Sequence, residues 1–331
     1  MRDIFEYKNS FSKYDDVKSL MQYGSTERCP DPVISVIMPM YRRPEFFIHS
    51  YLSVKNQKVD FDYEIIIIDD TPIDGEKSET LKYLEREKPD NVFYFRNEFN
   101  LGQAGNWNRG ITLCRASMFT FCHDDDMFYP DCLSTLYSLH KKYPNRFIIP
   151  EFKMVDERAV YPFIDDRKVA PQLCMKYSKL DIFMDNPANG VGCLFYKDQM
   201  MSIGGYNNEY YPSHDNAIHI LLVIKYGAIK YNRQLFCYRI SNVNISNSVY
   251  KSNITNGVFY TQCMYPYIYL PRFVLKAMTH AYEANITETM ERVWGRKNDY
   301  CSRRILSDRL INIAFRLRAK IRRLILMYKR L

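Results

Sequence analysis

The chain has 331 residues, of which 47% are hydrophobic and 25% are charged, a composition typical of a folded globular protein. This excludes disordered, collagen-like and low-complexity classes, and the length allows one large domain with extensions or two smaller domains. The net charge of +8 lies at one end, because residues 303–331 carry ten Lys or Arg and one Asp. The remaining residues sum to −1, so the body is not expected to bind nucleic acid.

The cysteine pattern and the N-terminus indicate a cytoplasmic protein. The nine cysteines include no CxxC or CxxxC spacing, which excludes a zinc ribbon or a thioredoxin-type motif and favours buried, reduced thiols. The first residues contain no apolar segment of a secretory signal. No run approaches the roughly 18 apolar residues that cross a membrane.

Strands alternate with helices over the first half of the chain. Residues 1–32 are polar and Tyr-rich, and they are expected to form an N-terminal extension that packs on the body. The expected strands are 33–38, which Pro39 stops, 63–69, 91–95, 117–122 and 146–150, and the expected helices are 45–56, 76–88, 103–114 and 131–142. Short apolar strands that alternate with helices predict a parallel sheet covered on both faces.

The alternation loosens after residue 150. Residues 151–185 are typical of turns and loops. A short strand at 192–196, a helix at 197–203, a helix at 214–227 and a strand at 229–238 are expected next. From about residue 257 onward we expect helices only.

Two groups of carboxylates follow strands of the predicted sheet, namely Asp69 with Asp70 and the run 124–126. Ligands of such sheets bind beyond the carboxyl ends of the strands. Three adjacent carboxylates repel one another, and a hard cation such as Mg²⁺ or Mn²⁺ would stabilise them. A solvated acidic turn at 124–126 and an Asx turn before Thr71 are the alternatives. The two groups together favour a nucleoside diphosphate and its metal.

The order and spacing of motifs carry a family resemblance. The motifs are Ser35–Tyr41 (SVIMPMY), Glu64–Asp70 (EIIIIDD), Asn100-x-Gly102-x5-Asn108-x-Gly110, Asp124-Asp125 with Pro130-Asp131, Gly204-Gly205-Tyr206, Glu209, His214-Asp215, Tyr238-Arg239 and Asn244-x-Ser246. Together they resemble the family 2 glycosyltransferases of GT-A fold over residues 33–248.

The resemblance implies an α/β, GT-A (Rossmann-like) fold, with a mostly parallel sheet flanked by helices and a helical C-terminal extension. The implied glycosyltransferase domain is residues 33–250, with a nucleotide-binding half at 33–126 and an acceptor half at 127–250. Residues 251–331 form the implied helical region, which ends in a basic amphipathic helix.

The resemblance also implies residues that hold the nucleotide. Pro39 and Tyr41 match the loop around the nucleobase, where Tyr41 stacks on the base. Asp70 matches the aspartate that bonds the base, which is uracil in the best-known members. Asn108 lies on the helix whose side chains approach the nucleotide, and Asp124 matches the residue near the ribose and the diphosphate.

The metal and the catalytic base follow from the same resemblance. Asp125 is the implied direct ligand of Mn²⁺ or Mg²⁺, with Asp124 beside it, and Asp215 matches the catalytic base. Arg239 matches a position where the family often has a polar residue near the diphosphate. Glu209 is expected to position its turn or to contact the acceptor, and His214 to be structural or to face the acceptor.

Two positions depart from the family pattern, and His123 between the second of them and the acidic run has two interpretations. His214 stands where an acidic residue is usual, which affects the assignment of Asp215 as the base. Cys122 replaces the first Asp of the common D-x-D-D form, so the ligands are expected among residues 124–126. His123 is expected to pack or to hydrogen bond, with contact to the metal or phosphate as the alternative.

The resulting hypothesis is an inverting glycosyltransferase that moves a sugar from a nucleotide-sugar, foremost a UDP-sugar, to a hydroxyl of a glycan or lipid-linked acceptor. Synthesis of cell-surface polysaccharide or glycolipid is the implied pathway. One alternative is a degenerate, non-catalytic GT-A protein that binds glycan or membrane. A nucleotidyltransferase is the other, although the loop 39–44 after the first strand lacks the glycines that such enzymes use.

The tail at 303–331 places apolar residues at steps of three and four from Leu306 to Leu331, with Lys and Arg on the rest of the helix. A basic amphipathic helix of this kind is typical of attachment to an anionic membrane surface. The alternative is a terminal helix that packs on the body. Membrane attachment would place the protein on the inner face of the cell membrane.

Overall fold

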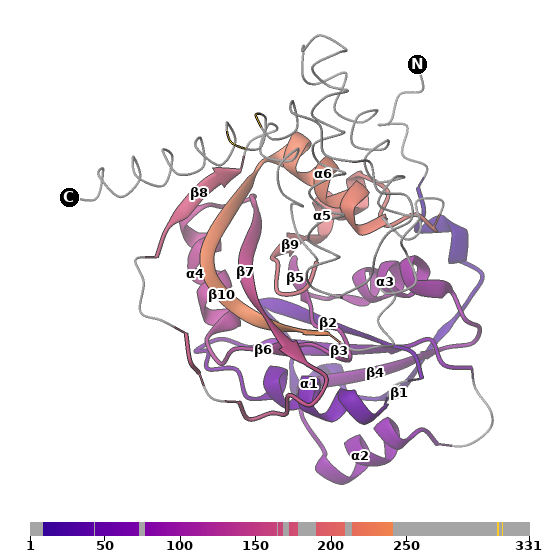
Figure 1. Cartoon of the computed structure of the whole chain (residues 1–331). Coiled ribbons are helices and arrows are strands. Elements are labelled where there is room, and N and C mark those ends of the chain that lie inside the picture. The colour runs from indigo at the N-terminus through magenta and orange to yellow at the C-terminus, as the bar shows by residue number, and fades with distance from the viewer. Residues whose placement is uncertain are drawn as a thin grey trace.

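A six-stranded sheet and a smaller four-stranded sheet organise the part of the chain that the computed structural model describes (Figure 1). The described residues are 9–42, 44–72, 77–163, 165–167, 172–177, 190–208, 214–240, 310 and 313. The strands are β1 Ser19–Tyr23, β2 Ile34–Met40, β3 Tyr63–Asp69, β4 Val92–Asn97, β5 Met118–Phe121, β6 Met127–Phe128, β7 Phe147–Asp156, β8 Cys174–Tyr177, β9 Phe195–Tyr196 and β10 Ala228–Ile240. The α-helices are α1 Pro44–Lys55, α2 Glu79–Glu87, α3 Gly102–Leu113, α4 Cys132–Lys142, α5 Lys197–Ser202 and α6 His214–Tyr226.

The large sheet has the strand order β1-β4-β3-β2-β5-β9. Its four central strands, β4, β3, β2 and β5, are parallel, and the edge strands β1 and β9 are antiparallel to their neighbours. Parallel neighbours need a crossover connection, and the helices between these strands supply it. The predicted α/β class with a mostly parallel sheet is therefore confirmed.

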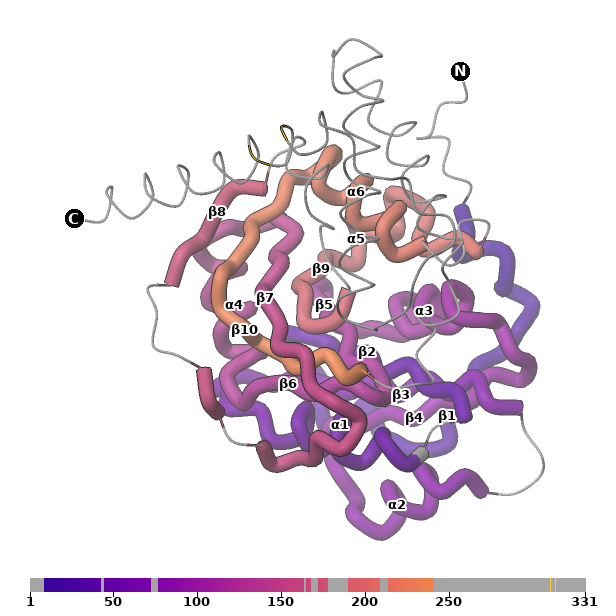
Figure 2. Tube along the Cα trace, in the orientation of Figure 1, coloured from indigo at the N-terminus to yellow at the C-terminus, as the bar shows by residue number. Residues whose placement is uncertain are grey.

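Both faces of the large sheet are buried because apolar side chains alternate between two cores. On β3, Ile66 and Ile68 face one core, which includes residues of α3, α5 and α6. Ile65 and Ile67 face the other core, which includes residues of α1, α2 and α4. Burial on both faces explains why this strand is an almost uninterrupted run of isoleucine. In Figure 2, α6 and α2 accordingly lie at opposite ends of the molecule.

The predicted end of the first strand is wrong, because β2 continues through Pro39 to Met40. Proline has no backbone N–H, and a strand tolerates it where it is not needed as a donor to a neighbour. On the β5 side the pairing of β2 ends at Ile37, so Pro39 lies beyond that ladder. The strand therefore continues on the β3 side, where Pro39 is opposite Ile68.

The expectation of turns and loops from residue 151 to 185 is also wrong in part. Strand β7 runs to Asp156 and β8 occupies Cys174–Tyr177. The 13-residue strand β10 pairs with β7 in parallel and with β6 and β8 antiparallel, and Figure 1 shows it curving alongside β7. The predicted strand at 192–196 is shorter than expected, because only residues 195 and 196 belong to β9.

The described part of the predicted N-terminal extension lies against the body. Strand β1 adds to the edge of β4, and the backbone N–H of Ser10 donates to the carbonyl of Gly204. The guanidinium of Arg109 on α3 donates to the carbonyl oxygens of Tyr14 and Val17. The division into domains at residues 32 and 250 stays a prediction.

The predicted C-terminal helices lie outside the described residues, apart from residues 310 and 313, which are helical. Within the described part of the chain, no helix is long and apolar enough to cross a membrane.

Candidate functional site

Asp70, predicted to bond the nucleobase, follows the end of β3 and is almost fully buried. Its carboxylate accepts the backbone N–H groups of Leu101 and Gly102 at 2.9–3.0 Å and the side-chain amide of Asn97 at 2.9 Å. Burial raises the pKa of Asp70, and these donors act in the opposite direction. Asp70 therefore fixes the start of α3, and contact with a base stays a prediction.

Tyr41, predicted to stack on the base, follows β2 and is 42% exposed. The guanidinium of Arg42 lies 5.1 Å from the centre of its ring. Arg42 has a positive φ of 54°, and its backbone N–H donates to the Thr71 hydroxyl at 3.0 Å. The loops after β2 and β3 are thus joined, and Tyr41 presents an aromatic ring at the carboxyl end of the sheet. Pro39 is buried within β2.

A tight turn after β5 presents the acidic run. The backbone N–H of Asp126 donates to the carbonyl of His123 at 3.2 Å, which closes the turn. Ser50 on α1 donates its hydroxyl to the backbone carbonyl of Asp124 at 2.9 Å. The side chains of Asp124 and Asp125 are 2% and 7% exposed, so both predicted metal residues lie in a largely buried turn.

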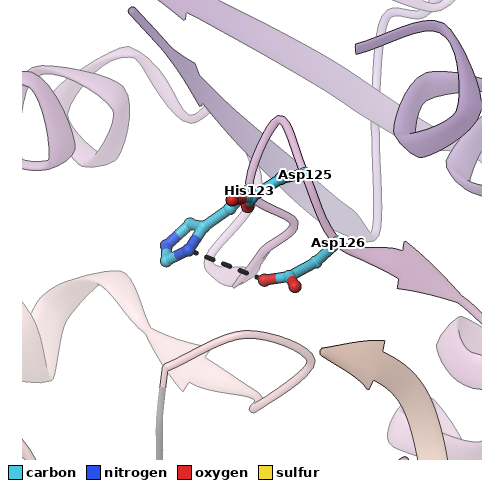
Figure 3. Close-up of side chains that lie close together, drawn as sticks. All are labelled: His123, Asp125 and Asp126. Atoms are coloured by element: carbon cyan, nitrogen blue, oxygen red, sulfur yellow. Dashed lines mark ion pairs between the residues drawn. The ribbon is translucent and has the colours of Figure 1, made fainter. Parts of the chain in front are cut away.

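His123, Asp125 and Asp126 form the group with the geometry of a cation site. One ligand atom from each of the three lies within 4.8 Å of the others, and Figure 3 shows the imidazole of His123 facing the carboxylate of Asp126. Asp124 does not belong to this group. Carboxylate oxygens and an imidazole nitrogen are ligands that divalent metals accept, so these residues fit a metal. Burial and the charge of Asp125 raise the pKa of Asp126 well above its ordinary value.

Arg239, predicted to contact the diphosphate, is 1% exposed and holds the acidic turn in place. Its guanidinium donates to the backbone carbonyls of Asp125, Glu157 and Ala159 at 2.6–2.8 Å. Its backbone N–H donates to Oδ1 of Asp126 at 2.9 Å. The structure thus gives Arg239 a positioning role in the turn, and contact with a diphosphate stays a prediction.

Arg239→Met is expected to lower the free energy of unfolding by about 2–5 kcal/mol, because it leaves the buried carbonyl of Asp125 and two partly buried carbonyls without this donor. Chemical denaturation measures this loss. The exposed Arg158→Met is the matched control, and a change of less than about 0.5 kcal/mol is expected there. Unchanged stability in Arg239→Met would contradict the positioning role.

His214 and Asp215 open helix α6. His214 is 1% exposed, and burial lowers its pKa to about 4, so the imidazole is neutral at pH 7. Burial raises the pKa of Asp215 to about 6. The backbone N–H of Asn216, which donates to the Asp215 carboxylate at 2.7 Å, lowers this pKa and offsets part of the effect of burial. A carboxylate with this pKa can accept a proton near neutral pH, which suits a general base.

Asn108 locks α3 to the Gly204–Tyr206 turn. Its amide N–H donates to the carbonyl of Tyr206 at 2.7 Å, and its Oδ1 accepts the backbone N–H of Tyr206 at 2.8 Å. A Cβ on Gly205 would lie 2.6 Å from Oδ1 of Asn108, and Gly205 has a φ of +70°, so the turn requires glycine. Both amide atoms of Asn108 thus hold the fold together, and its contact with a nucleotide stays a prediction. Glu209 lies outside the described residues.

A cluster of three rings, which the sequence did not predict, connects the acidic turn to α6. The indole of Trp107 stacks on the ring of His123, with centres 5.2 Å apart, and lies 5.0 Å from the ring of His214. These residues belong to α3, the turn after β5 and α6. Their spacing in the sequence gives no sign of this contact, although His123 beside the acidic run was a partial signal.

Comparisons with known proteins identify the family that the chain resembles. Residues 35–196 match the family model for glycosyl transferase family 2. The chain is 36% identical over 107 residues to the GalNAc(5)-diNAcBac-PP-undecaprenol beta-1,3-glucosyltransferase of Campylobacter jejuni. This aligned region is 32% of this chain and 33% of that protein. It is 28% identical over 177 residues to an uncharacterised glycosyltransferase of Haemophilus influenzae, and this aligned region is 52% of this chain and 56% of that protein. The chain thus spans about a third to a half of the length of these relatives.

Solved structures show the same fold. The chain matches the Staphylococcus aureus TarS fragment 1–349 in complex with UDP-GlcNAc, with a TM-score of 0.56 and 13% identity, over 78% of this chain and 74% of that one. It also matches the mannosyltransferase PcManGT of Pyrobaculum calidifontis in complex with GDP-Man and Mn²⁺, with a TM-score of 0.52 and 12% identity, over 90% and 84%. These likenesses show a GT-A fold.

Proposed function

The chain belongs to glycosyl transferase family 2, and from this premise we propose that it transfers a sugar from a nucleotide-diphosphate sugar to a hydroxyl of an acceptor. A UDP-sugar is the foremost candidate donor. The observation that supports this most is the arrangement at the carboxyl end of the large sheet. There the carboxylates after β3 and β5 accompany the exposed ring of Tyr41, as a nucleoside diphosphate with its metal requires.

A divalent metal, Mn²⁺ or Mg²⁺, belongs to this proposal. Asp125 would hold it, with Asp124 or the neighbouring His123 and Asp126 completing the protein ligands. When bound, such an ion neutralises the charge that develops on the departing diphosphate. Arg239 contributes by holding the backbone of Asp125 in position.

Asp215 acts as the base in the proposed transfer. The acceptor hydroxyl attacks the anomeric carbon from the side opposite the diphosphate and loses its proton to the Asp215 carboxylate. One carbon–oxygen bond forms, the bond to the diphosphate breaks, and the anomeric configuration inverts. The step requires no nucleophile from the protein, in contrast to retaining glycosidases.

The acceptor we propose is a glycan or a lipid-linked saccharide of the cell surface. The name of the Campylobacter jejuni relative refers to a saccharide on undecaprenol diphosphate. A relative from Escherichia coli, WcaA, 30% identical over 112 residues, is named as a candidate colanic acid glycosyl transferase. A lipid-linked acceptor lies at the membrane, which agrees with a peripheral position on its inner face through residues 303–331.

Deletion of residues 303–331 is expected to release the protein from liposomes that contain anionic lipid, because the deletion removes a net charge of +9 and the apolar residues of the amphipathic helix that the sequence predicts. Co-sedimentation at low and high salt measures the binding, and liposomes of neutral lipid are the control. Equal sedimentation of the shortened and full-length chains would refute attachment through the tail.

A thermal-shift screen followed by a turnover assay tests the proposed function. The screen combines Mn²⁺ or Mg²⁺ with UDP, GDP, CDP and dTDP and their sugars, because a ligand of the folded state raises the melting temperature. A metal-dependent shift with one nucleotide, and release of that nucleotide from its sugar, are expected. A shift without release or transfer would favour the degenerate, binding-only alternative, and no shift at all would contradict a donor site.

A further inference from the structure

The turn after β5 directs a buried carboxylate oxygen toward an imidazole without a hydrogen bond between them. Oδ2 of Asp126 lies 3.7 Å from Nδ1 of His123, a separation too long for a hydrogen bond. Asp126 has no exposed surface, and its Oδ2 makes no hydrogen bond among the described residues. The other oxygen, Oδ1, accepts the backbone N–H of Arg239. Only Oδ2 is therefore left to bind something else.

The separation fits two ligands of one ion. A nitrogen and an oxygen ligand, each about 2.1–2.2 Å from the same metal, lie at most about 4.3 Å apart. The distance of 3.7 Å between His123 and Asp126 falls below this limit. A carboxylate oxygen of Asp125 lies within 4.8 Å of the other two ligand atoms. It would need to move toward them by about half an ångström at most to come within the limit of about 4.3 Å.

Trp107 holds the imidazole in place. The two rings stack at 5.2 Å with an angle of 21° between their planes. Trp107 is only 6% exposed and is packed edge-on against Tyr206 at 4.9 Å. A ligand whose orientation is fixed by packing is already arranged for the ion.

We propose that His123 is a nitrogen ligand of the divalent metal, together with Asp125 and Asp126, and that it gives the site a preference for Mn²⁺ over Mg²⁺. Mg²⁺ favours oxygen ligands in nearly ideal octahedral geometry and retains several waters. Imidazole nitrogen favours first-row transition ions over Mg²⁺. This inference rests on the proposed function in one respect: the bound ion would serve the proposed sugar transfer.

Calorimetric titration of the full chain with Mn²⁺ alone and Mg²⁺ alone tests the proposal without any substrate. The unaltered chain is expected to bind Mn²⁺ at least about 10-fold more tightly than Mg²⁺. His123→Gln is expected to weaken Mn²⁺ binding by about 10- to 100-fold and to reduce the ratio of the Mn²⁺ affinity to the Mg²⁺ affinity. His214→Gln, which alters another imidazole in contact with Trp107, is the matched control and should retain the affinity for Mn²⁺.

Asp126→Asn is a second variant, because its amide oxygen can still accept the N–H of Arg239 while the ligand charge is lost. It is expected to weaken Mn²⁺ binding as His123→Gln does, with circular dichroism showing that both variants are folded. Absence of Mn²⁺ binding in the unaltered chain, or an unchanged Mn²⁺/Mg²⁺ ratio in folded His123→Gln, would overturn the proposal. Mn²⁺ binding without sugar transfer would instead contradict the proposed function and leave this metal site standing.

Discussion

Asp215→Asn is expected to lower the rate of sugar transfer by about 10²- to 10⁴-fold, the usual contribution of a general base. The asparagine has the size of the aspartate, and its amide oxygen can still accept the backbone N–H of Asn216. Binding of the donor nucleotide should therefore remain, because the substitution removes only the group that takes the acceptor proton. Single-turnover transfer and calorimetric donor binding measure the two effects separately.

The pH dependence of transfer gives a second readout of the same residue. Burial raises the pKa of Asp215 to about 6, and only its ionised form can take a proton. The transfer rate should rise with pH through about 6 and level off above 7, and Asp215→Asn should lack this rise. Asp198→Asn, an exposed carboxylate on α5, is the matched control and should keep both the rate and the profile. Full activity in Asp215→Asn would eliminate Asp215 as the base.

Asp125→Ala is expected to abolish the metal-dependent thermal shift with the donor nucleotide and to lower transfer by at least about 10²-fold. A bound metal supplies several kcal/mol to the departing charge, and about 3 kcal/mol corresponds to 10²-fold in rate. The fold should be retained, because alanine keeps the backbone carbonyl of residue 125 that accepts the guanidinium N–H of Arg239. Melting curves with and without Mn²⁺ and UDP measure the loss.

The exposed carboxylate Asp60 provides the control for this substitution. Asp60→Ala should retain both the thermal shift and the transfer rate. A metal-dependent shift that persists in Asp125→Ala would mean that the ion is held elsewhere, and transfer that persists without the shift would mean that the reaction proceeds without the ion.

The sheet and the place of its acidic residues could be predicted from sequence because both depend on local patterns. The isoleucine run of β3 has the composition of a strand buried on both faces, and its boundaries agree with the prediction. Asp70 follows β3 and the turn at 123–126 follows β5, two parallel strands with β2 between them, so both lie at the carboxyl edge of the sheet.

The partners of individual side chains could not be predicted, because they depend on contacts between distant segments. Asn108 bonds the backbone of Tyr206, 98 residues away, and Arg239 bonds that of Asp125, 114 residues away. A motif match names such residues without saying whether they face a ligand or hold the chain. His123 shows the same limit, since its contact with Trp107 requires α3 to pack beside the turn.

The position of β1 affects the order in which the protein can fold during synthesis. Ser19 pairs with Asn97, 78 residues later, so this part of the N-terminus must wait until β4 has left the ribosome. The central strands β2 and β3 come together earlier, since less chain separates them, and closing a longer loop costs more entropy. The edge of β4 is then covered by a segment that was made before it, which shields a free strand edge from other nascent chains.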